Sequence, residues 1–171
     1  IAVTGPIVGG IDLAVAPDDS VVLLGYFQGT IMAGGQPFTA ADSGAFVVKV
    51  TPSGTVEWAR ALIGPGAAHA FALAVGPSGE IVVVGEFSGD LDFAVGQAAS
   101  AEGNDGFIWG LDEAGAPQWV ETFGGSAGDD AEWARDVAID AEGNIAITGA
   151  YTGAAELGGV ELPDAGFPSG A

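Results

Sequence analysis

A twelve-residue pattern occurs three times in this chain, at residues 14–25 (AVAPDDSVVLLG), 74–85 (AVGPSGEIVVVG) and 138–149 (AIDAEGNIAITG). Each copy is a short apolar run, a turn-forming tetrad, a second apolar run rich in β-branched residues and a closing glycine. The closing glycines of successive copies are 60 and 64 residues apart. A long internal period of this kind indicates a repeat protein, in which each unit buries its apolar faces against its neighbours.

A second pattern recurs between the copies of the first, at residues 44–58 (GAFVVKVTPSGTVEW) and 105–119 (DGFIWGLDEAGAPQW). Its closing tryptophans, Trp58 and Trp119, are 61 residues apart. Both patterns predict β-hairpins, because β-branched and aromatic runs flank short turn-forming segments. The turn tetrads place Gly79 and Gly143 where a type I turn followed by a bulge requires positive φ, and Asp19 takes that place in the first copy.

These hairpins predict four strands in each unit of about sixty residues. The first two strands are apolar on both faces, as in residues 21–24 and 81–84, so both faces must be covered. The third strand alternates more, with Phe46 and Val48 on one face and Lys49 on the other. Small antiparallel four-stranded sheets stacked face to face are the blades of a β-propeller. A β-sandwich is the main alternative, but it does not explain why a four-strand unit repeats.

The predicted fold class is therefore all-β, a single β-propeller region over residues 1–171 with roughly 2.75 blades present. The expected units are 1–10 (the end of a blade), 11–65, 66–128 and 129–171 (an incomplete blade). A closed propeller has about four to eight blades. We therefore expect the remaining blades to come from a longer polypeptide or from further copies of the chain.

Composition narrows the possible partners. Three basic residues against 23 acidic residues leave a net charge of −20, which disfavours nucleic acid and anionic membranes and leaves cations, basic proteins and neutral sugars. The chain has no cysteine, which excludes disulfides and thiolate chemistry. No apolar stretch approaches the roughly 20 residues of a membrane span, and no signal peptide is expected in this stretch.

Residues 123–153 (FGGSAGDDAEWARDVAIDAEGNIAITGAYTG) resemble the bacterial β-propeller repeat called SBBP. The resemblance is carried by a Gly-Gly-Ser turn, an acidic pair, an Asp-x-x-Gly-Asn turn and a Thr-Gly strand end, at Gly124, Gly125, Ser126, Asp129, Asp130, Asp140, Gly143, Asn144, Thr148 and Gly149. The first copy departs from this pattern in its PDDS turn and LLG ending. The resemblance implies a propeller scaffold of a secreted or surface-anchored bacterial protein, in a family mostly without assigned function.

The candidate ligand-binding residues lie in the long connections, which share one end of every predicted blade, opposite the short turns. Function tends to reside in such loops. Asp129, Asp130 and Glu132 could together ligate calcium, which prefers carboxylate and carbonyl oxygens; the alternative is a solvated loop. Trp133 could stack on a sugar ring.

The remaining candidates favour structural roles. Asp140 and Asn144 are expected to bond their own turn. We expect Trp58 and Trp119 to pack one blade on the next, and Arg60 and Arg135 to pair with carboxylates.

No catalytic residue is predicted, because the single histidine, His69, has no nucleophile motif beside it and Ser126 lacks the Gly-x-Ser-x-Gly elbow. The leading hypothesis is a non-catalytic scaffold that binds a protein partner, or further blades, and is not an enzyme. The alternatives are a carbohydrate- or calcium-binding lectin-like module and part of a propeller enzyme whose catalytic residues lie in other blades. No cofactor is expected apart from that calcium.

Overall fold

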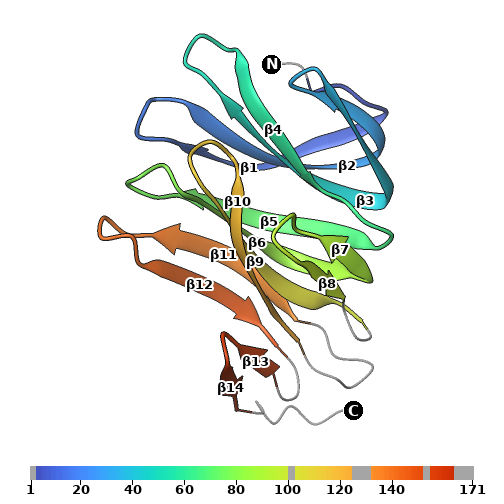
Figure 1. The fold of residues 1–171 in the computed structure, drawn as a ribbon, viewed down its shortest axis with the longest axis vertical. Coiled ribbons are helices and arrows are strands. Elements are labelled where there is room, and N and C mark those ends of the chain that lie inside the picture. The colour runs from blue at the N-terminus through green and yellow to red at the C-terminus, as the bar shows by residue number, and fades with distance from the viewer. Residues whose placement is uncertain (1–2, 100–102, 125–131, 152–154, 164–171) are drawn as a thin grey trace.

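The computed structural model describes residues 3–99, 103–124, 132–151 and 155–163 (Figure 1). These residues form antiparallel strands and turns, so the all-β prediction is confirmed. Sheet 1 has the order β1 (Ile7–Val15), β2 (Val21–Ala33), β3 (Gln36–Val50) and β4 (Val56–Leu62). Sheet 2 has the order β5 (Ala67–Val75), β6 (Ile81–Ser88), β9 (Asp105–Leu111) and β10 (Pro117–Phe123). In the described parts of the chain, no helix is long and apolar enough to cross a membrane.

Three smaller pairs complete the described strands. β11 (Trp133–Ile139) pairs with β12 (Ile145–Ala150), and β13 (Ala155–Leu157) pairs with β14 (Val160–Leu162). The connection between β6 and β9 contains the short hairpin of β7 (Asp90–Asp92) and β8 (Gln97–Ala99). β1 begins inside the segment 1–10, which the sequence assigns to the end of a preceding unit.

The short turns have the backbone that the repeated tetrads predict. Gly79 and Gly143 have φ values of 83° and 86°, and Asp19 has a φ of 63°. Asp140 accepts hydrogen bonds from Asn144 through both backbone and side chain, which confirms its predicted role. The short turns lie at one end of the sheets, on the left of Figure 1, and the β4–β5 and β6–β9 connections lie at the other end. The long connection expected within each unit is absent from sheet 1, where a tight turn at Gly34 and Gly35 joins β2 to β3.

The sheets pack on one another in chain order, as the stacked layers of Figure 1 show. The core between sheets 1 and 2 contains Val22, Leu24, Val47, Trp58, Leu73, Val83, Phe107 and Trp109. The other face of sheet 2 packs on β11, in a core of Ala72, Val82, Val84, Ile108, Phe123, Ala134 and Val137. The first strands β1, β5 and β11 are neighbours in space.

Burial follows this stacking. Every residue of β9 is buried, as are residues 81–84 of β6, because sheet 2 is covered on both faces. In β2, Val22 and Leu24 are buried and Leu23 is partly exposed, because Leu23 lies on the outer face of sheet 1. The sequence predicts coverage of both faces at residues 21–24 and 81–84, and this holds fully only for residues 81–84.

Glycine and aromatic residues face each other across neighbouring strands. In six cross-strand pairs, a Cβ added to the glycine would overlap the aromatic ring: Gly9–Tyr26, Gly25–Phe46, Gly44–Phe27, Gly85–Phe107, Gly106–Phe123 and Gly110–Trp119. The ring lies over the bare backbone of its partner, which pins the strand register. This packing accounts for part of the 30 glycines in the chain.

Candidate functional site

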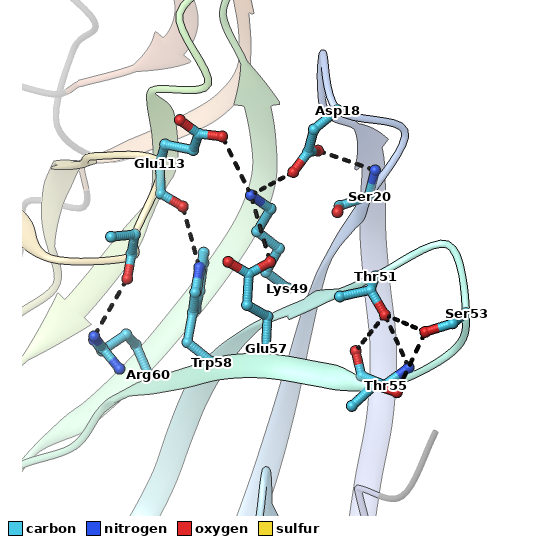
Figure 2. Close-up of polar contacts among 11 residues, drawn as sticks. Asp18, Ser20, Lys49, Thr51, Ser53, Thr55, Glu57, Trp58, Arg60 and Glu113 are labelled. Carbon is cyan, nitrogen blue, oxygen red and sulfur yellow. Dashed lines mark hydrogen bonds and ion pairs between the residues drawn. The ribbon is translucent and has the colours of Figure 1, made fainter.

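A polar cluster lies between sheets 1 and 2 and is centred on Lys49, the central residue of Figure 2. Its side chain is only 2% exposed, although Asp18, Glu57 and Glu113 are 42–59% exposed. Lys49 Nζ lies 2.9 Å from Asp18 Oδ2, and 3.6 Å from both Glu57 Oε2 and Glu113 Oε1. Because Glu113 belongs to the β9–β10 turn, the ammonium group ties the two sheets together.

The carboxylates keep this buried ammonium group charged. Burial by itself lowers the pKa of Lys49, but the hydrogen bond to Asp18 and the nearby charges of Glu57 and Glu113 outweigh it and raise the pKa above its usual value. The same Lys49 bond, with the Ser20 N–H, lowers the pKa of Asp18. A lysine held protonated in this way is unsuited to act as a base or nucleophile, so the cluster is structural.

Two further side chains of β4 hold the same turn of sheet 2 (Figure 2). Trp58 is buried and donates its Nε1–H to the carbonyl oxygen of Glu113 at 3.1 Å, as predicted. Arg60 donates to the carbonyl oxygen of Ala114 at 3.5 Å and lies 5.8 Å from the centre of the Trp58 ring. The expected carboxylate partner of Arg60 is therefore wrong for the described residues.

Arg135 departs from its prediction in the same way. Its guanidinium carbon lies 4.9 Å from the centre of the Phe71 ring, and no described carboxylate pairs with it. Arg135 and Phe71 occupy the bulge positions of β11 and β5, one residue before Asp136 and Ala72. The interaction is therefore cation–π, between the first strands of two neighbouring sheets.

The bulge of β1 carries a second polar link between sheets 1 and 2. Asp12 accepts a hydrogen bond from its own neighbour, Leu13 N–H, at 2.8 Å and another from Leu73 N–H of β5 at 3.0 Å. Leu73 needs this acceptor because Ala72 stands where β1 has Asp12 and β11 has Asp136. The Asp12 carboxylate therefore accepts hydrogen bonds at the bulges of both β1 and β5.

A hollow of about 360 Å³ opens between sheets 1 and 2 at the long-connection end. It is lined by Ile11, Tyr26, Gln28, Ser43, His69, Ala70 and Phe71. His69 Nδ1 lies 3.3 Å from Glu86 Oε1, which also accepts from Asn104 Nδ2 at 3.1 Å. The hollow lies at the end of the sheets where the sequence predicts binding.

The predicted calcium and sugar residues are only partly within the described chain. Asp129 and Asp130 lie outside the described residues. Glu132 is 1% exposed, and its backbone N–H bonds the carbonyl oxygen of Asn104 at 3.0 Å, so it is not part of a solvated loop. Trp133 is partly buried and begins β11, opposite Ala150. Across residues 3–99, 103–124, 132–151 and 155–163, no three His, Asp or Glu side chains gather to hold a metal.

No protein-family model matches this chain, and no curated protein matches it. The resemblance to SBBP repeats therefore stays a prediction from the motifs quoted above.

Sequence reasoning missed Lys49 and the residues of the hollow. Lys49 is the only lysine of a strongly acidic chain and lies within the otherwise apolar run 45–50, which was a usable signal for a buried ion cluster. Tyr26, Gln28 and Ser43 gave no such signal, because sheet pairing and stacking alone bring them together with His69.

Proposed function

We propose that this chain is a non-catalytic scaffold whose four-stranded sheets are blades of a β-propeller, and that it works by binding further blades and a partner. The proposal is supported by the face-to-face order of sheet 1, sheet 2 and β11–β12, with β1, β5 and β11 adjacent. The resemblance to SBBP repeats supports a secreted or surface-exposed bacterial protein. The clusters around Lys49 and Asp12 link the sheets and leave no free reactive group in those clusters.

The observation that carries the proposal is the open part of the outer face of sheet 1, over β1 and β2. The part over β3 and β4 is already covered by the extended β2–β3 hairpin, whose Ile31 is buried with Val48. An apolar groove of about 480 Å³ runs along this face, lined among others by Val8, Leu13, Leu23 and Phe46. Leu13 is 60% exposed. The exposed apolar side chains Leu13 and Val15 continue this groove along β1.

Sheet 2 shows what kind of surface fits this groove. Leu73 and Val83 occupy the strand positions of Leu13 and Leu23, and both are buried under the inner face of sheet 1. Because the two sheets place apolar side chains at matching positions, the same kind of surface should cover Leu13. We infer that the occupant is another four-stranded unit, supplied by further blades or, in the isolated chain, by a second copy.

Sedimentation equilibrium of the purified chain tests this proposal. We expect concentration-dependent association that Leu13→Glu abolishes, because the new carboxylate would be buried in the interface. Val160→Glu is the matched control, since Val160 is 63% exposed on β14, away from the groove. A wild-type chain that stays monomeric, or a Leu13→Glu variant that associates as the wild type does, would overturn the proposal.

A further inference from the structure

We propose that the hollow between sheets 1 and 2 binds the ring of a neutral sugar. The inference adds a ligand class at the long-connection end and does not depend on the covering of sheet 1. The volume of the hollow, about 360 Å³, falls within the range of small-molecule sites, roughly 300–1,000 Å³.

The polar groups of the hollow lack partners within the described protein. Ser43 is only 8% exposed, yet its hydroxyl has no hydrogen-bond partner among the described residues. The Tyr26 hydroxyl and the Gln28 amide are also without described partners, and the Glu86 contact leaves Nε2 of His69 available. The hydroxyl of Ser43 reaches the open hollow, where it is available to bond a ligand in place of water.

The apolar part of the hollow contains a fixed aromatic ring. Tyr26 lies over the backbone of Gly9, where a Cβ would overlap the ring, and its side chain is still 42% exposed. Phe71 and Ala70 line the same hollow. An exposed aromatic ring held in one orientation, beside hydroxyl and amide groups, suits a molecule with both C–H faces and hydroxyl groups.

The charge of the hollow and of the chain narrows the class of ligand further. No lysine, arginine, aspartate or glutamate lines the hollow, and the chain as a whole carries −20, which disfavours an anionic ligand. The carboxylate beside it, Glu86, does not line the hollow, and its Oε1 accepts from Asn104 and contacts His69. A neutral polyhydroxylated ring fits a hollow that no lysine, arginine, aspartate or glutamate lines, in a chain whose net charge disfavours anions.

Among the described residues, the equivalent place between sheet 2 and β11 has no such set of unpartnered groups. There, by strand register, Glu86 occupies the position equivalent to Tyr26, and Asn104 the position equivalent to Ser43. Asn104 Nδ2 donates a hydrogen bond to Glu86 Oε1 at 3.1 Å. Arg135 stands for Phe71 and lies over the Phe71 ring itself. The unpartnered polar groups are therefore particular to the hollow between sheets 1 and 2.

The test is a ¹H–¹⁵N titration of the purified chain with glucose, galactose, mannose and N-acetylglucosamine, each up to tens of millimolar. At least one sugar should shift the amides of Gly9, Ser43 and Ala70 saturably. Tyr26→Ala should abolish the shifts, and Tyr151→Ala, which changes the only other tyrosine, should retain them. The same titration of Leu13→Glu separates sugar binding from self-association.

Ser43→Ala distinguishes a ligand site from a structural position. The melting temperature should stay close to that of the wild type, because the hydroxyl has no described protein partner, and loss of its bond to the sugar should weaken binding by about three- to tenfold. The inference is overturned if none of the four sugars shifts these amides, if Tyr26→Ala binds as the wild type does, or if glucuronate, an anionic sugar, binds as well as the neutral ones.

Discussion

Sheet 2 packs against sheet 1 on one face and against β11–β12 on the other, and the two interfaces are built differently. The first contains Lys49 with its three carboxylates, the buried Trp58, and Asp12 bonded to Leu73. At the matching positions facing β11–β12 the chain has Gly110, Trp119 and Ala72, and Trp119 is 37% exposed over Gly110.

The difference separates the features that recur in both interfaces from the polar links that belong to one of them. Strand order, turn geometry and apolar burial recur in both interfaces, whereas the Lys49 and Asp12 links belong to the first. Among the described residues, the second has the bond from Glu132 N–H to the carbonyl oxygen of Asn104. In the second, the described contact between charged and aromatic side chains is Arg135 on Phe71. We therefore expect the first interface to be the more stable of the two.

The largest expected effect is at the paired tryptophans. Trp58→Ala should lower the free energy of unfolding by about 3–5 kcal/mol, because it removes a buried ring and its bond to Glu113. Trp119→Ala should cost about 1 kcal/mol, because its ring is partly in water and the lost burial is smaller. Urea unfolding of the two variants measures both, and equal losses would contradict the difference between the interfaces.

Lys49→Met should have the next largest effect, a loss of about 1–2 kcal/mol. The methionine fills the space, but Asp18, Glu57 and Glu113 then repel one another without the ammonium group. Glu57→Gln is the control and should cost less than about 1 kcal/mol, because that carboxylate is 44% exposed. Chemical denaturation gives both values, and a Lys49→Met variant as stable as the wild type would show that the cluster adds nothing to apolar packing.

Removal of the Asp12 carboxylate should lower the free energy of unfolding by slightly less than Lys49→Met does. Asp12→Ala leaves two backbone N–H groups without their acceptor, in Leu13 and Leu73, and should lower stability by about 1–1.5 kcal/mol. Asp136→Ala removes the acceptor of Val137 alone and should cost about 0.5 kcal/mol. Thermal unfolding of the two variants compares them, and the reverse order would contradict the proposed link between sheets.

The smallest effect is the pH dependence of the first interface. The pKa of Asp18 is lowered in the folded state, so its contribution is present above the unfolded pKa of about 3.9 and is lost as pH falls through the folded value. The raised pKa of Lys49 places its loss on the alkaline side, above about pH 10.4. Asp18→Asn should therefore be less stable than the wild type at pH 7 and approach it as the pH falls below the unfolded pKa of about 3.9 and through the lowered folded value. A stability difference that stays constant from pH 7 to pH about 2, followed by urea midpoints, would exclude this titration.

The sequence predicted the parts of the fold that depend on local chemistry. The turn conformations at Gly79 and Asp19 follow from residue type, and the role of Trp58 follows from its place after the turn glycine. Lys49 was placed on the correct face, but its burial could not be foreseen, because its carboxylate partners come from separate turns and strands. The hollow at Tyr26 and Ser43 likewise depends on how two sheets stack.

Native-state amide hydrogen exchange tests most directly whether the sheets are stacked units of unequal attachment. Amides of β3, β6 and β9 should exchange only through global unfolding, because the first interface holds sheets 1 and 2 together. Amides of β11 and β12 should exchange at a lower free energy, and Trp119→Ala should change them more than it changes β3. Equal protection of β12 and β6 would contradict the account.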